Sequence, residues 1–217
     1  MRLLSLFLLL PLAAWSQVAA NANKNYTTKE GREQVAKTLA NPDRDKTQKP
    51  EAVAAALELR PGMTVADIGT GIGYMLPYLS KAVGPSGKVL GEDIQSDFLD
   101  QAKARVANAK LTNVSLILGT DTDPKLPAAA ADVELVLDVY HHFDYPDKML
   151  ALLARGLKPN GYLVIVEYYK FNSPPGPDHI RLDRDDVVKE IGDNGFRLLS
   201  KNDRITENQY MLTFVRK

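Results

Sequence analysis

A short segment, Val65–Gly73, constrains the fold more than any other part of the chain. It predicts a buried β-strand that ends in an acid, Asp67, followed by a turn with glycines at positions 69, 71 and 73. Glycine lets the backbone turn tightly and approach a ligand where a Cβ atom would clash. The residues beyond the turn predict a helix from about Tyr74 to Val83. The N-terminal end of that helix would face whatever the turn binds.

The glycine spacing argues against a dinucleotide site. A dinucleotide fingerprint requires a glycine at position 74, where this chain has Tyr74. Asp67 directly precedes the turn, and a carboxylate there would repel phosphate groups. The chain also has no Tyr-x-x-x-Lys pair of the kind that short-chain dehydrogenases use. An NAD-dependent oxidoreductase is therefore disfavoured.

The pattern Asp-x-Gly-x-Gly-x-Gly after a strand resembles motif I of the class I S-adenosylmethionine (SAM) dependent methyltransferases. In that family the turn wraps the zwitterionic amino-acid end of SAM, which can use a nearby carboxylate. A second acid, Asp93, ends the predicted strand 89–93, where the family places the acceptor of both ribose hydroxyls. The resemblance implies that SAM is bound by Asp67, Gly69, Thr70, Gly71, Gly73, Asp93 and Ile94.

Two more turns at the same expected sheet edge complete this candidate site. In the family, the turn after the third strand contacts the adenine, often through an acid near its start. This chain has Thr120 where that acid is more usual, so Thr120 and Asp121 are the expected adenine contacts. The alternative is a plain turn made of good turn-forming residues. Asp138, after the fourth predicted strand, is the last expected SAM-binding residue.

The run Tyr140-His141-His142 supplies the candidate catalytic residues. The family often has an aromatic residue and a histidine here, beside the sulfonium and the acceptor pocket. Tyr140 could cover the cationic sulfonium with its ring. His141 or His142 could act as a general base, because an unperturbed imidazole titrates near working pH. The alternative is that one histidine hydrogen-bonds the loop and the other is solvated.

The resemblance also indicates whether the site is expected to bind a metal ion and which loops are expected to surround it. Metal-dependent catechol-type methyltransferases use paired acid and amide ligands after the fourth and fifth strands. Asp138 and Glu167 match part of that set, but no Asp-Asn pair follows the fifth strand, so we expect no metal. We expect the loop 168–181 to border the acceptor, and Arg44 with Asp45 to close over the site as a lid.

Residues 61–217 alternate β-rich runs with helical periodicity, which is typical of a parallel sheet with crossover helices. Strands are predicted at 64–68, 89–93, 113–118, 133–139, 162–168, 197–203 and 209–215. Helices are predicted at 26–40, 51–59, 74–83, 96–110 and 146–155, and from 183 or 185 to about 193. The order resembles the methyltransferase architecture, a doubly wound and mostly parallel seven-stranded sheet that ends in an antiparallel hairpin. Residues 23–60 would form an N-terminal helical cap.

The first 22 residues predict a secretory signal peptide. Arg2 precedes an apolar run from Leu3 to Ala14, and small residues follow it. The run is short for a membrane span, although an uncleaved anchor is the alternative. We therefore expect an exported, periplasmic protein. The chain has no cysteine, which removes lipid acylation at a cysteine and agrees with an oxidising compartment.

The amino-acid composition limits the classes of partner and substrate that are expected for this protein. Among the 217 residues, 27 basic and 27 acidic side chains balance, so nothing points to a nucleic acid. Arsenic methyltransferases share the fold but rely on cysteine thiols, which excludes that activity. The sequence predicts direct SN2 transfer of a methyl group from SAM to a small molecule. The alternative is an exported, non-catalytic module that keeps the fold and binds a nucleoside-like or other small ligand.

Overall fold

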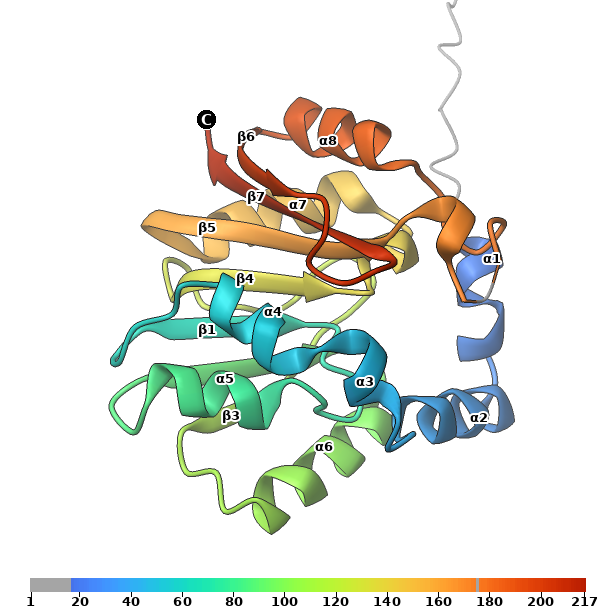
Figure 1. The fold of residues 1–217 in the computed structure, drawn as a ribbon. Coiled ribbons are helices and arrows are strands. Elements are labelled where there is room, and N and C mark those ends of the chain that lie inside the picture. The colour runs from blue at the N-terminus through green and yellow to red at the C-terminus, as the bar shows by residue number, and fades with distance from the viewer. Residues whose placement is uncertain (1–16, 175) are drawn as a thin grey trace, which may run out of the picture.

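A seven-stranded sheet in the order β3-β2-β1-β4-β5-β7-β6 forms the centre of the molecule. The computed structural model describes residues 17–174 and 176–217 (Figure 1). The strands are β1 (Thr64–Ile68), β2 (Lys88–Asp93), β3 (Val114–Leu118), β4 (Ala131–Leu137), β5 (Leu157–Tyr168), β6 (Phe196–Asn202) and β7 (Gln209–Arg216). The first five run parallel, and β7 pairs antiparallel with both β5 and β6. The predicted mostly parallel sheet with a C-terminal antiparallel hairpin is confirmed.

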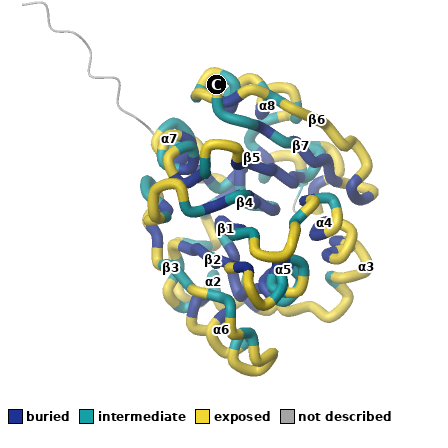
Figure 2. The backbone as a smooth tube through the Cα atoms, turned by 90° about the vertical axis from the view of Figure 1, so that its left-hand side faces the viewer, coloured by how far each residue is buried: buried dark blue, intermediate teal, exposed yellow. Residues whose placement is uncertain are grey.

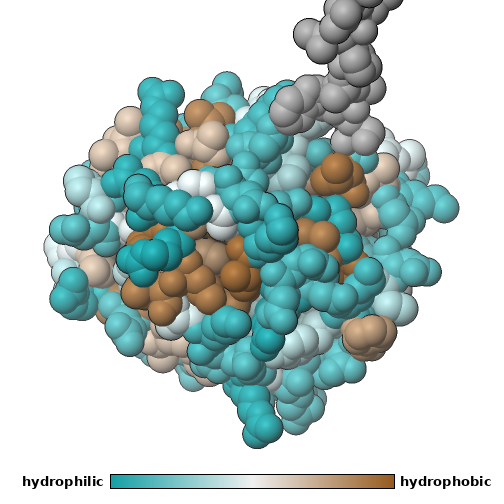
Figure 3. Space-filling model, turned by 90° about the horizontal axis from the view of Figure 1, so that it is seen from above, coloured by the Kyte–Doolittle hydropathy of each residue, from teal (hydrophilic) through white to brown (hydrophobic). Residues whose placement is uncertain are grey.

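Helices cover both faces of the sheet and divide the core into two layers. One face carries α4 (Pro50–Ala56), α5 (Leu76–Val83) and α6 (Ser96–Asn108); the other carries α7 (Pro146–Gly156) and α8 (Arg184–Asp193). Adjacent residues of β1 show the division, because Val65 packs into the first layer and Ala66 into the second. Figure 2 shows the strands as mostly buried and the connecting turns as exposed. The sheet edge at β6 is largely exposed. Figure 3, which views the molecule from that end, shows mostly hydrophilic side chains with several hydrophobic groups among them, the largest left of the centre.

Helix α7 shows how the sequence encodes one of these layers. Pro146 stands in its first turn, where the missing N–H is not needed, and Asp147 lies at the positive end of the helix dipole. Met149, Leu150 and Leu153 recur at helical spacing and are fully or almost fully buried. The apolar stripe therefore fixes which side of the helix meets the sheet.

Short N-terminal helices lie along the edge where the parallel strands end (Figure 1). They are α1 (Ala20–Asn23), the 3₁₀ turn η1 (Lys24–Tyr26), α2 (Lys29–Leu39) and α3 (Arg44–Gln48). The predicted helix 26–40 is split because Thr28 caps α2, its Oγ1 accepting the Gly31 N–H at 3.1 Å. The sequence did not predict α3.

The structure describes only part of the region around the predicted signal-peptide boundary, beginning at residue 17. The apolar run 3–14 lies outside the described residues. The predicted boundary at residue 22 falls inside α1, and the Ala19 N–H donates to Asp144 Oδ1 at 3.1 Å. The signal peptide and its cleavage position stay predictions. In the part of the chain that the structure describes, no helix combines the length and apolarity needed to cross a bilayer.

Several other predicted boundaries differ from the structure by a few residues, and three of these differences have an identifiable physical reason. Ser96 was predicted as an N-cap but begins α6, and the preceding Gln95 donates its N–H to Asp93 Oδ1 at 2.8 Å. Strand β5 begins at Leu157 rather than 162, because Leu157 already pairs with Ala131. Strand β4 ends at Leu137, since Asp138 adopts a positive φ of 55°.

Glu134 allows a test of how a buried polar side chain affects the stability of the core. It is fully buried in β4, and neither carboxyl oxygen has a hydrogen-bond partner among the described residues. Burial raises its pKa well above the usual value, with Arg216 acting in the opposite direction. We expect Glu134→Met to stabilise the protein by about 1–2 kcal/mol, because it removes an unsatisfied buried polar group.

Scanning calorimetry at neutral pH would measure this as a rise of a few degrees in the melting temperature, roughly 2–4 °C per kcal/mol. Glu51→Met, at an exposed position of α4, is the matched control and should change little. A lower melting temperature for Glu134→Met would contradict the argument.

Candidate functional site

A cavity of about 350 Å³ opens at the carboxyl ends of β1, β2 and β4, with the N-terminal helices as its outer wall. This is the place where open α/β sheets bind their ligands. The predicted site residues that line it are Asp67, Gly69, Thr70, Gly71, Asp93, Ile94, Thr120, Asp121, Asp138 and His142. Gly73, Tyr140 and His141 are not among the lining residues.

The glycine turn after β1 is built for close contact. Gly69 has φ +67°, and a Cβ atom there would lie 2.5 Å from Val139 Cγ1, so glycine lets the loop after β4 pack against the turn. Gly71 has φ +57°, and a Cβ atom there would meet only Leu39 Cδ1, at 3.3 Å. Gly71 therefore leaves its cavity side open. A Cβ atom at position 73 would instead meet Leu76 and Ala102, so Gly73 serves helix packing rather than the cavity.

Asp93 and Asp67 are tied to the turn by hydrogen bonds. The Gly71 N–H donates to Asp93 Oδ2 at 2.8 Å, and the Thr70 hydroxyl donates to Asp67 Oδ2 at 2.6 Å. Burial raises the pKa of Asp67 to about 7, against the effect of the Thr70 hydrogen bond. Burial likewise raises the pKa of Asp93 to about 6, against the N–H donors of Gln95, Gly71 and Ile94. At neutral pH Asp93 is therefore mostly ionised, whereas Asp67 is only about half ionised.

Glu92 is a site residue that the sequence analysis missed. It lines the cavity, accepts the Gly69 N–H at 3.3 Å, and is almost completely buried. Its Oε1 atom is buried without a hydrogen-bond partner among the described residues, and burial raises the pKa of Glu92 well above its usual value. An acid directly before Asp93, at the penultimate position of β2, was the available signal.

The N-terminal helices bring a cation to the cavity. The Arg44 guanidinium lies 4.0 Å from the centre of the Tyr74 ring, and its Nη2 atom lies 3.9 Å from Asp138 Oδ2. The neighbouring Asp45 accepts hydrogen bonds from the hydroxyls of Tyr74, at 2.7 Å, and Tyr78, at 3.0 Å. Arg44 thus lines the cavity while Asp45 anchors α3 on α5, and closure of these residues as a lid stays a prediction.

The cavity carries far more acids than bases. The acidic lining residues are Asp67, Glu92, Asp93, Asp121, Asp138 and Asp144. Among the described lining residues, Arg44 is the only arginine or lysine. This balance favours a positively charged ligand and disfavours a polyphosphate.

Tyr140 lies away from the cavity, contrary to the expectation that it covers the methyl donor. Its side chain is buried, and its hydroxyl donates to Glu190 Oε1 at 2.6 Å. Arg181 forms a paired contact with the same carboxylate, at 2.6 and 2.9 Å. These partners draw the Tyr140 ring into the α7–α8 layer.

The two neighbouring histidines are both held at Nδ1. His141 is buried, and its Nδ1 atom lies 2.6 Å from Glu167 Oε2. His142 lines the cavity, and its Nδ1 atom lies 2.8 Å from Asn23 Oδ1. Burial lowers the pKa of both imidazoles below the usual value. Burial therefore disfavours the charged form of both rings, and a role for either histidine as general base stays a prediction.

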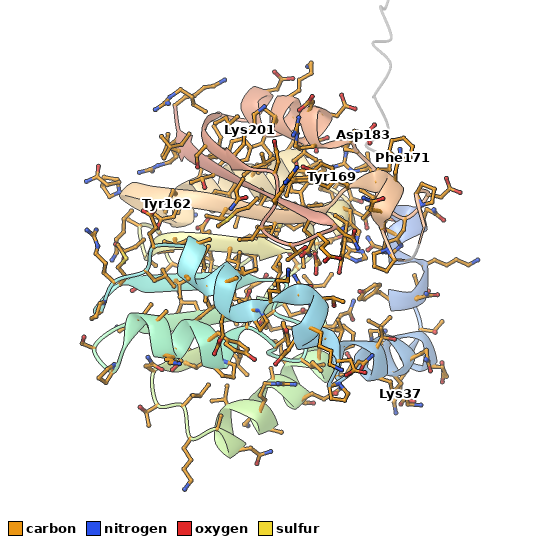
Figure 4. The ribbon with its side chains drawn as sticks, in the orientation of Figure 1. Lys37, Tyr162, Tyr169, Phe171, Asp183 and Lys201 are labelled. Atoms are coloured by element: carbon orange, nitrogen blue, oxygen red, sulfur yellow. The ribbon has the colours of Figure 1, made fainter. Side chains whose placement is uncertain are left out.

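The loop after β5 lies on the same side of the molecule as His141 and His142. It places His179 against the other two histidines, with ring centres 4.8 Å from His141 and 5.4 Å from His142. Phe171, which is 85% exposed, stands beyond the end of β5 on the side of the N-terminal helices (Figure 4). The loop predicted to border the acceptor therefore does approach the cavity, through His179.

The sheet order and the glycine turn at a ligand cavity define a Rossmann-like α/β protein. A family model described as a methyltransferase domain matches residues 66–165. The crystal structure of a SAM dependent methyltransferase from Aquifex aeolicus aligns with a TM-score of 0.79 and 31% identity, covering 83% of this chain and 96% of that one. A ubiquinone/menaquinone biosynthesis C-methyltransferase from Bordetella avium is 33% identical over 131 residues, 55% of this chain and 46% of that protein. An arsenite methyltransferase from Halobacterium salinarum is 31% identical over 141 residues, 64% of this chain and 34% of that protein.

This chain belongs to the class I SAM-dependent methyltransferases. SAM is the methyl donor of that family. The chain spans less than half the length of the curated relatives it matches first, among them the Bordetella avium enzyme.

Proposed function

We propose that this protein binds SAM in the cavity and transfers its methyl group to a small-molecule acceptor. The observation that carries the proposal is the charge of the cavity. Six acids and one arginine line it. Burial raises the pKa of Asp67, Glu92, Asp93 and Asp138 in the empty cavity, and a ligand with a sulfonium and an ammonium group would favour the ionised forms of the acids it approaches. Its volume of about 350 Å³ also falls within the usual range for small-ligand sites, roughly 300–1,000 Å³.

The described residues fit SAM at three places. Gly71 leaves room for close approach of the amino-acid end, where Asp67 supplies a carboxylate. Asp93 keeps acceptor capacity for the ribose hydroxyls, since each of its oxygens has a second lone pair beyond the N–H bonds it accepts. Thr120 and Asp121 line the cavity where the family contacts adenine.

The sulfonium of bound SAM supplies an electrophilic methyl group with a good leaving group. The protein then acts mainly by positioning the reactants and excluding water. Arg44 and Tyr26 form the outer wall that excludes water, and the Asp45 contacts hold that wall closed. A neutral His142 can accept a proton from an acceptor that must lose one, because Asn23 leaves its Nε2 atom free. The reaction itself is a direct SN2 displacement.

The acceptor class rests on the relatives and on composition. The similar proteins from Bordetella avium and Halobacterium salinarum are named as methyltransferases of quinone biosynthesis and of arsenite. We therefore propose a small-molecule acceptor here too. Arsenite itself is disfavoured, because the chain has no cysteine.

Calorimetric titration of the purified protein with SAM tests the proposal. We expect saturable binding of one SAM per chain and no binding of NAD⁺, whose phosphates the acidic cavity would repel. A folded protein that ignores SAM would overturn the proposal and favour the non-catalytic binding module. If SAM binds, small molecules that support the formation of S-adenosylhomocysteine would be candidates for the second substrate.

The affinity for SAM should depend on pH. Burial raises the pKa of Asp93 to about 6 and of Asp67 to about 7, so both acids are mostly protonated at pH 5 without ligand. A cation favours their ionised forms, so binding releases protons and tightens as pH rises. We expect the dissociation constant to fall by about tenfold or more from pH 5 to pH 8.

The stability of the ligand-free protein should fall as pH rises, whereas its affinity for SAM increases. Acids whose pKa is raised by folding stabilise the protein below about pH 4 and lose that contribution as pH rises through 6 to 7.

For SAM binding, calorimetric titration in buffers of different ionisation enthalpy would count the protons that are released when the ligand binds. An affinity that is flat across this range would contradict the role given to the two acids.

We also propose that the protein is exported, on the basis of the positive residue and apolar run at its N-terminus. Fractionation of the native host, with an antibody against the protein, tests this directly. Recovery in the cytosolic fraction at full length would overturn the proposal.

A further inference from the structure

All three histidines of the chain meet at one point. His141 and His142 lie on the 3₁₀ turn η2 (Tyr140–His142) after β4, and His179 comes from the loop after β5. One ring nitrogen from each lies within 4.8 Å of the others. The contacts come from segments far apart in the sequence, so the cluster is a product of the fold.

The hydrogen bonds around His142 fix its tautomer. Asn23 donates its Nδ2 to the His142 carbonyl oxygen and to Asp144 Oδ2, both at 3.0 Å, and both of these groups can only accept. The amide orientation is thereby set, and Asn23 Oδ1 must accept from His142 Nδ1. The neutral ring then carries its lone pair on Nε2.

His141 is oriented in the same way by a carboxylate. Glu167 Oε2 lies 2.6 Å from His141 Nδ1, and the other oxygen of Glu167 accepts the Tyr168 N–H at 2.8 Å. With Glu167 ionised, His141 donates from Nδ1 and keeps its lone pair on Nε2. No hydrogen bond to the Nε2 atom of either His141 or His142 is found within the described residues.

This arrangement is the one that metal-binding histidines use. A histidine that binds a metal commonly donates its other ring N–H to a carboxylate or carbonyl oxygen, which fixes the ring and increases its basicity. Three imidazoles with an open fourth position form a familiar zinc site. Nitrogen atoms bound to Zn²⁺ at about 2.0–2.1 Å lie roughly 3.3 Å apart, so the rings need to close by about 1.5 Å.

The charges nearby also suit a cation. Glu167 and Asp144 are the acids next to the cluster, through His141 and Asn23 respectively. Arg181, whose charge acts on His141, forms a paired contact with Glu190 that offsets part of that charge. The side of the cluster at His142 opens on the cavity.

We propose that His141, His142 and His179 form a binding site for a divalent transition-metal ion of the Zn²⁺ type, with its open coordination position toward the cavity. This departs from the sequence expectation of no metal. Binding of the ion does not depend on the proposed methyl transfer. A bound ion would occupy the Nε2 lone pairs, so His142 would then hold the ion rather than act as a general base.

The test uses full-length protein without an affinity tag, stripped with a chelator and titrated with Co²⁺ and then Zn²⁺. We expect one ion per chain, with the visible absorption of Co²⁺ in a site of low coordination number. His179→Ala should weaken binding about 100-fold, and Asn23→Ala about tenfold, since a supporting hydrogen bond is typically worth 10–100-fold in affinity. Asp178→Ala, an exposed neighbour in the same loop, should change nothing.

A second measurement avoids substitutions. Long-range ¹H–¹⁵N NMR spectra report imidazole nitrogens, and this chain has only three histidines. Zn²⁺ should shift one nitrogen of each ring in step with the titration. An absence of saturable binding, or equal affinity in His179→Ala, would overturn the inference. A SAM titration of the same stripped sample keeps this failure distinct from failure of the proposed function.

Discussion

Asp93→Ala should weaken SAM binding about 100-fold. Two hydrogen bonds from ribose hydroxyls to a carboxylate contribute roughly 1.5–3 kcal/mol each, so losing both costs about 3 kcal/mol or more. The substitution also leaves the N–H groups of Gly71 and Gln95 without the oxygens that accept them at 2.8 Å. The glycine turn therefore loses support at the same time as the ligand loses its acceptor. Calorimetric titration of both proteins at pH 8 measures the effect.

Two variants separate these contributions. Asp93→Asn keeps one acceptor oxygen without the charge and should fall between wild type and Asp93→Ala. Asp100→Ala, at an exposed position of α6, should bind SAM as wild type does. Equal affinity in wild type and Asp93→Ala would remove Asp93 from the SAM site and with it the closest parallel to the family's ribose contact.

Gly69→Ala should destabilise the fold by about 2–5 kcal/mol. Gly69 has φ +67°, which costs an L-residue roughly 1–2 kcal/mol. The new Cβ atom would lie 2.5 and 2.6 Å from the Val139 γ-carbons, and overpacking of this kind costs about 1–3 kcal/mol. The melting temperature should fall by about 10 °C.

The second variant in this series isolates the clash. Val139→Ala removes both γ-carbons and leaves the nearest atom at 3.1 Å, so the double substitution should lose less stability than the sum of the two single ones. Gly192→Ala is the matched control in α8, where a Cβ atom would meet nothing within 4 Å. It should stabilise the protein by about 0.5–1 kcal/mol, because alanine is the better helix former. Destabilisation of equal size at both positions would contradict the argument from close contact.

The sequence by itself determined the sheet and the position of the ligand cavity. The strand Thr64–Ile68 is found with the predicted bounds, and the glycines after it turn as predicted. This success has a local cause, because buried parallel strands are continuous apolar runs and glycine marks positive φ. Most of the predicted SAM-binding residues line the cavity for the same reason, since parallel strands deliver the loops that follow them to one edge.

Only the tertiary structure decided which side chains enter the cavity. Tyr140 was a reasonable candidate from its position after β4, yet Glu190, fifty residues later, draws its hydroxyl away. Glu92 and the outer wall with Arg44 depend likewise on contacts between distant segments. The three-histidine cluster is the clearest case, because Asn23, Glu167 and His179 orient and complete it from three separate elements. Local sequence patterns record backbone preference and burial, whereas side-chain direction at a site is set by partners that only the folded chain brings together.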